Sequence, residues 1–265
     1  MSDTFPHGLW ARIEQAGRIC CGMLQDDRLA VFDRPAYCGG HATGETIAVA
    51  GARWLTPCEP ATMIGLWNNF HAAAAKNGFA IPTEPLYFLK ASGCHAAHEQ
   101  PIPRPAAYDG RVVYEGELGI VIGAECRGVS PAEARERIFG FTCVNDVTAL
   151  ELLFRDPSFT QWSRAKSFDG FGAFGPLIAT GVDSDALIVR TLVDGRERQN
   201  YPVSDMIFRP TDIVSRISQD MTLSPGDVIA CGTSVGVLPM RDGQVVEVAI
   251  DGIGTLRNVF GGGRS

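Results

Sequence analysis

Residues 111–124 read RVVYEGELGIVIGA, and this stretch decides the fold class. Its β-branched and apolar residues run between glycines over a length typical of a strand. Similar strands are expected within 176–181, 186–195, 226–237 and 243–260. Strands therefore outnumber helices, and the sequence predicts an α+β, β-rich fold.

Three helices are predicted beside these strands. One covers Ala61 to Lys76 and ends before an Asn-Gly pair. A second starts at Ser130, which is followed by proline and then by glutamate at the third position of the helix, and runs to about Ile138. The third covers Asp212 to Gln219, with Thr211 as its expected capping hydroxyl.

The 265-residue chain is expected to divide into two unequal parts. Residues 1–57 are short glycine-rich strands and predict a small N-terminal subdomain. Pro57 and Pro60 mark the junction, and residues 58–265 are expected to form the catalytic domain.

Composition predicts which partners the chain lacks. Lys and Arg total 23 against 30 Asp and Glu, which gives a net charge of −7 and argues against a nucleic-acid partner. No apolar run approaches the ~20 residues that a membrane span needs. The eight cysteines form no Cys-x-x-Cys pair and no secretory leader precedes them, so reduced thiols and a cytoplasmic location are expected.

The main chemical feature is an acidic group. Glu115 and Glu117 are two residues apart in a predicted strand, so their side chains share one face. Asp146 follows the short apolar strand Phe141–Asn145, where it can project into a site. Three carboxylates without a cysteine partner favour a hard cation, Mg²⁺ or Mn²⁺.

Seven motifs occur in order along most of the chain: YEGEL (114–118), VNDV (144–147), QWSRAKSFD (161–169), SDMIF (204–208), MTLSPGDV (221–228), GTSVGV (232–237) and GIGTLRN (252–258). With them the chain resembles the fumarylacetoacetate hydrolase family from about Trp54 to Phe260. The resemblance implies a mixed β-sandwich roll, a homodimer, and chemistry on 2-oxo and β-dicarbonyl acids, as in aromatic catabolism.

The resemblance also assigns roles to residues. It makes Glu115, Glu117 and Asp146 the metal ligands, puts the catalytic Lys166 beside the metal, and implies substrate binding by Thr233, Gly232 and Lys90. The first expectation is a metal-dependent hydrolase that cleaves a C–C bond in an acylpyruvate-type 2-oxo acid. A bound cation would stabilise the enolate that such cleavage creates.

Hydrolysis also needs a base to activate water. The family often carries it as His-x-x-Glu, and here His71 is present as the catalytic candidate while Ala74 occupies the glutamate position. Loss of the carboxylate favours the alternative, a decarboxylase or keto–enol isomerase of an oxaloacetate-like or 2-hydroxy-dienoate-like acid. A third hypothesis is a metal-binding homologue that has lost catalysis.

Two further departures concern the substrate. Leu150 and Leu153 stand where the family places an arginine and a glutamine, which predicts a more apolar pocket or an acid end held elsewhere, by Arg155 or Arg164. The family's asparagine and tyrosine after Gly-Leu are Trp67 and Asn68. Near the Phe-Leu-Lys motif, His95 or His98 could instead supply the base for hydrolysis, with Glu99 as its carboxylate partner.

Overall fold

The computed structural model describes residues 5–261, which form five α-helices, four 3-10 helices and nineteen strands. The α-helices are α1 (His71–Asn77), α2 (Pro131–Arg137), α3 (Leu150–Leu153), α4 (Trp162–Lys166) and α5 (Pro210–Asp220). The 3-10 helices are η1 (Ala36–Cys38), η2 (Ser92–Cys94), η3 (Ser184–Ala186) and η4 (Val203–Asp205). Within these residues no helix is long and apolar enough to cross a membrane.

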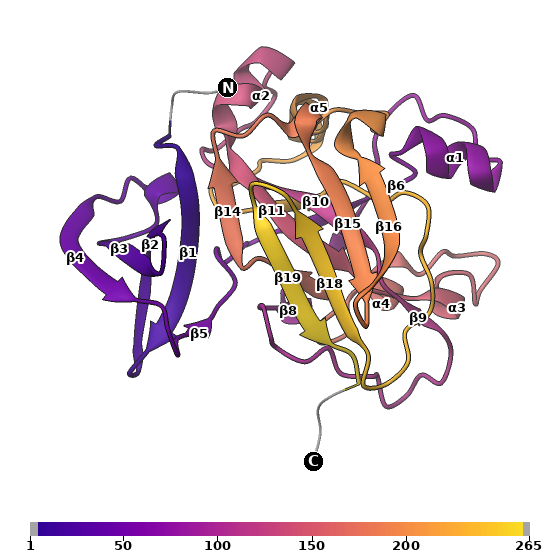
Figure 1. Ribbon diagram of the computed structural model, residues 1–265. Helices are drawn as coiled ribbons and strands as arrows, with labels where there is room; N and C mark the ends of the chain where they lie inside the picture. Colours follow the sequence, from indigo (N-terminus) through magenta and orange to yellow (C-terminus); the bar gives the residue numbers. More distant parts are fainter. Residues whose placement is uncertain (1–4, 262–265) are drawn as a thin grey trace.

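A mixed sheet of 13 strands runs through the molecule (Figure 1). Its path is β4-β3-β2-β1-β14-β11-β10-β17-β6-β7, with β5, β13 and β8 attached at the side, and β6 and β8 pair in parallel with β17 and β13. The strands are β1 (Gly8–Gln15), β2 (Arg18–Gln25), β3 (Arg28–Phe32), β4 (Ala42–Ala48), β5 (Arg53–Trp54), β6 (Met63–Trp67), β7 (Leu86–Lys90), β8 (His95–Ala96), β10 (Gly116–Ile122), β11 (Ile138–Asp146), β13 (Gly172–Phe174), β14 (Leu177–Thr180) and β17 (Val228–Ala230).

A second, four-stranded sheet packs against β10 and β11, the middle of the large sheet (Figure 1). Its order is β16-β15-β18-β19, made by β15 (Ile188–Val193), β16 (Arg196–Pro202), β18 (Val245–Ile250) and β19 (Gly254–Val259). A two-stranded pair, β9 (Val112–Val113) and β12 (Thr148–Ala149), flanks the end of β11. The β-rich α+β architecture and the sandwich of sheets predicted from the sequence are confirmed.

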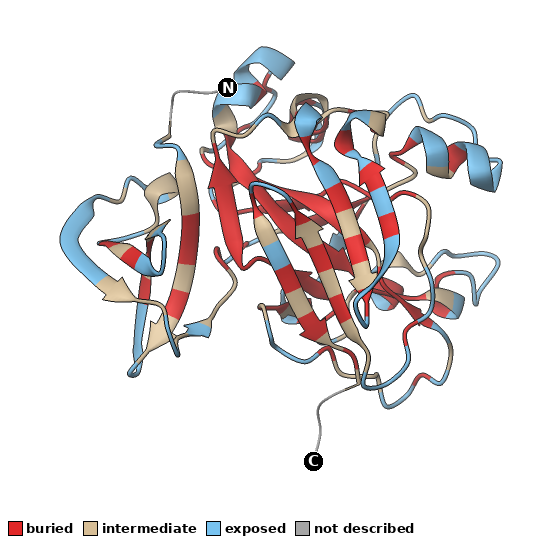
Figure 2. Cartoon of the chain, viewed as in Figure 1, coloured by how far each residue is buried: buried red, intermediate tan, exposed pale blue. Residues whose placement is uncertain are grey.

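The core lies around β10 and β11, where every residue is buried (Figure 2). Leu118 and Ile120 point into the larger cluster of core residues, and Val121 points into a second cluster on the other face. A strand covered on both faces reads as a continuous apolar run, which is why residues 118–122 carry no polar side chain. Glu117 and Asp146 are therefore carboxylates at the margin of an apolar core.

The first strands continue the large sheet at its outer end (Figure 1). β1 pairs with β14, and the Thr180 hydroxyl accepts hydrogen bonds from the Gly8 amide and the Trp10 indole. The predicted boundary at residue 57 remains a prediction.

The predicted helix over 61–76 is wrong in its first half. Met63–Trp67 is strand β6, held between β17 and β7, and α1 begins only at His71. The alanines after His71 give the segment helical propensity, but pairing in the sheet decides the conformation of the apolar residues before them.

The other two helices lie close to their predicted ranges. The capping box of Ser130 and Glu133 is present, and α2 ends at Arg137. The expected cap at Thr211 is wrong, because α5 begins at Pro210 with Arg209 as its N-cap and no side-chain capping bond. The strand expected over 226–237 is also shorter, since β17 covers only Val228–Ala230.

Gly116, between the two glutamates, lies in close contact with the small sheet. A Cβ atom at this position would overlap the Thr191 hydroxyl of β15. The Gly116 carbonyl accepts hydrogen bonds from the Tyr201 and Thr233 hydroxyls, and its amide donates to Gln199. Glycine is therefore required here by the contact between the sheets.

We expect Gly116→Ala to lower the free energy of unfolding by roughly 1–3 kcal/mol, because the added methyl group overpacks the contact between the sheets. Urea denaturation measures this. The matched control is Gly93→Ala, since a Cβ at Gly93 meets no atom within 4 Å, and its effect should stay within about 0.5 kcal/mol. Equal stability of the two variants would show that the sheets do not meet tightly at Gly116.

Candidate metal centre and active site

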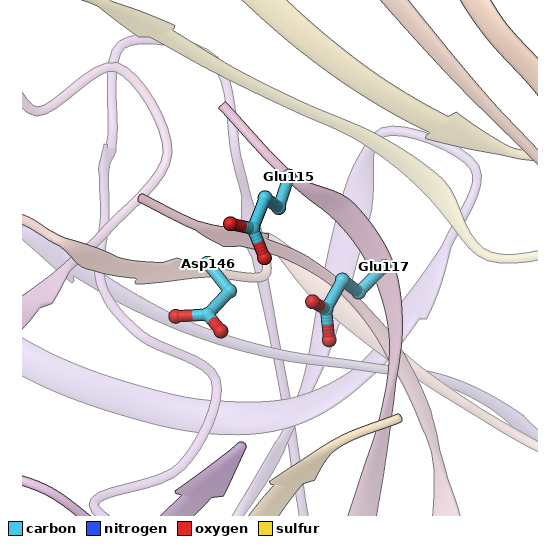
Figure 3. A group of neighbouring side chains, drawn as sticks. All are labelled: Glu115, Glu117 and Asp146. Carbon is cyan, nitrogen blue, oxygen red and sulfur yellow. The ribbon is translucent and has the colours of Figure 1, made fainter. Parts of the chain in front are cut away.

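Glu115, Glu117 and Asp146 come together at the junction of β10 and β11. One carboxylate oxygen from each lies within 4.8 Å of the others (Figure 3). Antiparallel pairing places Gly116 opposite Asn145, and the Asp146 amide donates to the Glu115 carbonyl, which sets the three residues side by side. Over residues 5–261 this is the only group of three or more acidic, histidine or cysteine ligands with such spacing.

The surroundings of the Glu117 carboxylate indicate that a cation fits this group. Its side chain is fully buried, and its Oε2 atom accepts a 2.7 Å hydrogen bond from the Gly232 amide. Its Oε1 atom is buried without any partner. Burial, and then the neighbouring Asp146 and Glu115, raise the pKa of Glu117 well above its ordinary value. A divalent cation would satisfy the unpaired oxygen and the uncompensated charge.

Lys166, the last residue of α4, lies against the same carboxylates. Its Nζ atom donates to Glu115 Oε2 at 2.8 Å and to Asp146 Oδ2 at 2.7 Å. Burial lowers the pKa of Lys166, but the three carboxylates outweigh it and raise the pKa above its usual value. Lys166 is therefore an ammonium group and a hydrogen-bond donor at the site.

Lys90, at the end of β7, lies on the other side of Asp146. Its Nζ atom donates to Asp146 Oδ1, to the Lys166 carbonyl and to the Phe171 carbonyl, and its side chain is 0% exposed. All three N–H groups are thus in use. The role in substrate binding that the sequence predicts for Lys90 stays a prediction.

Asp146 is held between these two lysines. Burial raises the pKa of Asp146, but the ammonium groups of Lys166 and Lys90 outweigh burial and bring the pKa below its ordinary value. Asp146 is consequently ionised and fixed at both oxygens. With Glu117 ionised, as binding of a cation requires, three carboxylates face two ammonium groups, and the cation would supply the missing positive charge.

Thr233 and Gly232 border the acidic group in the loop after β17. The Thr233 hydroxyl donates to the Gly116 carbonyl at 2.9 Å and accepts from Gln199 Nε2 at 2.8 Å. The Gly232 amide donates to Glu117. Both residues, predicted to bind substrate, reach the acidic site, and the contacts that the structure gives them hold the site together.

Gln199 is the site residue that sequence reasoning missed. It lies on β16, is 1% exposed, and its Oε1 atom accepts from the Thr191 hydroxyl and the Gly116 amide. It stands in the segment RERQNYP, whose neighbouring charges give no sign of burial. Only the packing of the small sheet brings it to Thr233.

The helix α1 closes a cavity of about 210 Å³ that reaches Glu115 and Thr233. Ala73, Lys76 and Asn77 of α1 line this cavity. His71 is exposed and does not line it, and Ala74 faces the core at 0% exposure. The predicted base thus lies on the same helix as the cavity wall but outside the cavity.

Of the residues predicted as an alternative base and its partner near the Phe-Leu-Lys motif, His98 and Glu99 contact β19, while the Nε2 atom of His95 is buried without a partner. His98 Nδ1 accepts from the Arg257 amide, and the Glu99 amide donates to the Arg257 carbonyl, so both residues hold β19. His95 packs edge-on against Phe174. None of the three joins the acidic group described above.

Leu150 and Leu153, which replace the family's arginine and glutamine, differ in their burial. Leu153 is buried in the core and Leu150 is half-buried at the start of α3. Arg155 and Arg164 are both exposed, and neither lines the cavity at Glu115.

A β-rich α+β fold with a buried carboxylate group and an adjacent ammonium group defines a protein with a candidate divalent-metal site. Residues 62–260 match the family model described as fumarylacetoacetate (FAA) hydrolase C-terminal, and residues 9–57 match one described as Rv2993c-like, N-terminal. The chain belongs to the fumarylacetoacetate hydrolase family.

Three relatives show the range of activities in its neighbourhood. The structure of 5-carboxymethyl-2-hydroxymuconate delta-isomerase from Mycobacterium smegmatis matches with a TM-score of 0.88 and 34% identity, covering 95% of this chain and 98% of that one. Fumarylacetoacetate hydrolase from Exiguobacterium antarcticum matches with a TM-score of 0.84 and 32% identity, covering 95% and 98%. The 4-hydroxyphenylacetate degradation bifunctional isomerase/decarboxylase of Salmonella dublin is 37% identical over 203 residues, which are 74% of this chain and 46% of that protein. The relatives are enzymes, with isomerase, decarboxylase and hydrolase activities among them.

We expect Glu117→Gln to abolish most of the stabilisation by metal. At saturating Mg²⁺ the wild-type melting temperature should rise by about 5 °C or more, because the cation binds only the folded chain. The variant should show little rise. The exposed control Glu125→Gln should respond like the wild type. Circular dichroism melts with EDTA or MgCl₂ measure this, and a full metal response in Glu117→Gln would remove Glu117 from the metal site.

In the absence of metal, Glu117→Gln should also change how the stability of the protein depends on pH. Since the pKa of Glu117 is raised in the folded state, the EDTA-treated wild type loses stability as pH rises above the unfolded value of about 4.5. Glutamine does not ionise, so the variant should not show this loss of stability. The stability of Glu117→Gln relative to wild type should therefore increase from pH 5 to pH 8, and the opposite trend would contradict a raised pKa.

We expect Lys90→Met to lower the free energy of unfolding by about 3–5 kcal/mol, because it removes one of the two partners that neutralise buried Asp146. Urea denaturation is the measurement, with exposed Lys76→Met as the matched control, expected within about 0.5 kcal/mol of wild type. A mild effect of Lys90→Met would mean that Lys166 alone neutralises Asp146.

Proposed function

We propose that this protein is a divalent-metal-dependent enzyme that stabilises the enolate of a 2-oxo acid, in keto–enol isomerisation or decarboxylation. The observation that carries the proposal is the lining of the cavity at Glu115. It includes donors such as Lys76, Ser234 and Asn77, but no imidazole and no carboxylate other than Glu115 among the described residues. All three reactions need charge stabilisation at the enolate oxygen; decarboxylation and isomerisation add a proton transfer to carbon, whereas hydrolysis adds an activated water.

Glu115, Glu117 and Asp146 are the residues that would hold the cation. Their all-oxygen set fits Mg²⁺, with Mn²⁺ as the second choice. The cation, when bound, supplies a Lewis acid that stabilises negative charge at the 2-oxo oxygen. Asp146 enters this task already ionised and oriented by Lys90 and Lys166.

Lys166 is proposed as the catalytic donor. Its raised pKa keeps a proton at Nζ, so Lys166 can hold the enolate oxygen by a charge-assisted hydrogen bond, in place of its longest contact, the 3.3 Å hydrogen bond to the Asp146 carbonyl. The Phe88 ring, 5.1 Å from Nζ, covers the ammonium group on one side and limits the access of water. Thr233, fixed by Gln199, completes the polar edge of the site.

The proposed substrate is a small 2-oxo or β-dicarbonyl acid with an apolar middle part. Leu66, Trp67 and Phe79 line the cavity that reaches Glu115, and Val235 and Val237 line it as well. We further propose that the chain works as a homodimer, as the family resemblance implies. The edge strand β7, with Leu86 and Leu89 exposed, offers apolar surface for such a contact.

C–C hydrolysis is the second candidate, because one observation favours it. His71 is in the first turn of α1, the helix whose Ala73 and Lys76 line the cavity. A movement of this exposed helix toward the cavity would bring the imidazole to the substrate, in the manner of a lid.

The two candidates predict different results for His71→Gln. An isomerase or decarboxylase should keep its turnover, while a hydrolase should lose about 10²–10⁴-fold, the contribution of a general base. Wild type and variant are incubated with Mg²⁺ and a panel of oxaloacetate, acylpyruvates and 2-hydroxy-dienoates, with products identified by mass spectrometry and an EDTA control. Lys166→Met should abolish turnover in either case. Metal binding without any turnover would instead support a non-catalytic homologue.

A further inference from the structure

The Gly116 carbonyl, between two of the candidate metal ligands, accepts two side-chain hydrogen bonds. The Asp146 amide donates to the Glu115 carbonyl, so the alternation of an antiparallel pair turns the polar backbone groups of Gly116 away from β11. On that side the Gly116 oxygen accepts from the Thr233 hydroxyl at 2.9 Å and from the Tyr201 hydroxyl. Since a carbonyl oxygen has two lone pairs, each donor can occupy one of them.

Of these two donors, Thr233 is the one that borders the cavity at Glu115. Thr233 is half-buried and lines that cavity, whereas Tyr201 is 3% exposed and does not line it. A hydroxyl group has a single proton, and Thr233 donates it to the Gly116 carbonyl. Thr233 can therefore donate to a ligand oxygen only by giving up its hydrogen bond to Gly116.

The cost of that exchange depends on Tyr201. Gly116 is buried, and a buried carbonyl without a donor costs free energy comparable to a lost hydrogen bond. The Tyr201 hydroxyl still contacts the Gly116 oxygen when the Thr233 proton turns away, so the carbonyl stays hydrogen-bonded. The Tyr201 ring is fixed edge-on against Phe70, with ring centroids 4.9 Å apart. Gln199 Nε2 donates to Thr233 Oγ1 at 2.8 Å, which holds this oxygen in place while its proton turns.

We infer that Tyr201 is a positioning residue for Thr233: it keeps the Gly116 carbonyl hydrogen-bonded while the Thr233 hydroxyl turns to an anionic oxygen of the bound 2-oxo acid. The inference rests on the proposed function, in which this acid binds beside the candidate metal ligands. It gives a role in ligand binding to a residue of β16 that does not itself line the cavity. A tyrosine that only joined the two sheets would contribute to folding and not to the affinity for the acid.

Isothermal titration of the full-length, Mg²⁺-loaded protein with 2-oxobutanoate tests the inference. Tyr201→Phe keeps the ring and removes only the hydroxyl, so it should weaken binding roughly tenfold, the value of about one unmade hydrogen bond. Thr233→Val should weaken binding by a similar factor. In Thr233→Val the change Tyr201→Phe should have no further effect, because the Gly116 carbonyl then has the same partners with and without the acid. In Thr233→Ser, which keeps the hydroxyl, the effect of Tyr201→Phe should return.

Tyr114→Phe is the matched control. Tyr114 is 1% exposed, and its hydroxyl donates at 2.8 Å to the Gly236 carbonyl, in the same loop as Thr233. This variant should keep the dissociation constant within about twofold of wild type. Equal weakening by Tyr114→Phe and Tyr201→Phe, or unchanged binding in Tyr201→Phe, would overturn the inference and leave the proposed function standing. Absence of 2-oxobutanoate binding by the Mg²⁺-loaded wild type would overturn both.

The response to metal separates this role from an indirect effect on the cation site. Gly116 lies between Glu115 and Glu117, so a displaced Gly116 peptide would also displace these carboxylates. If Tyr201 acts through Thr233, MgCl₂ should raise the melting temperature of Tyr201→Phe as much as that of the wild type, although the affinity for 2-oxobutanoate falls. A lost response to MgCl₂ in Tyr201→Phe would overturn the inference, because the hydroxyl would then act on the metal ligands.

Discussion

The pairing of buried Asp146 with two lysines is the constraint on which the site depends. A carboxylate with no exposed surface is tolerated only when both of its oxygens are neutralised and hydrogen-bonded. Lys90 and Lys166 meet this need from opposite sides, and so β7, β11 and α4 must converge on one point. Lys90 also binds the Lys166 carbonyl, which ties the position of the catalytic candidate to that of the metal ligand. The electrostatics of one side chain thus fix three elements.

A second constraint joins the two sheets at the same place. Gly116 has no side chain, so β15 can lie against the backbone between Glu115 and Glu117. Gln199 uses this closeness, because it contacts the Gly116 amide and the Thr233 hydroxyl at once. The same residues therefore join the two sheets and hold the site. A change that separates the sheets at Gly116 would also displace Thr233.

The sequence predicted those features that follow from local periodicity. Glu115 and Glu117 share a face because strands have a period of two, and Asp146 is the last residue of a strand that the apolar run already marks. Contacts between distant segments were beyond it: nothing around Lys90 in the sequence indicated its pairing with Asp146, and Gln199 had no signal at all. Met63–Trp67 was assigned to a helix because its partners β17 and β7 are known only from the fold.

Two departures from the family pattern lie on different helices. Leu150 and Leu153 are in α3, where Leu153 is buried in the core, while Ala74 is in α1, the helix whose Ala73 and Lys76 line the cavity at Glu115. The same helix carries Ala74 toward the core, where a glutamate would have to be buried without a partner. The helix α1 therefore carries His71 without an acidic residue of its own to orient the imidazole. This supports the proposal of enolate stabilisation over hydrolysis, because hydrolysis needs an activated water.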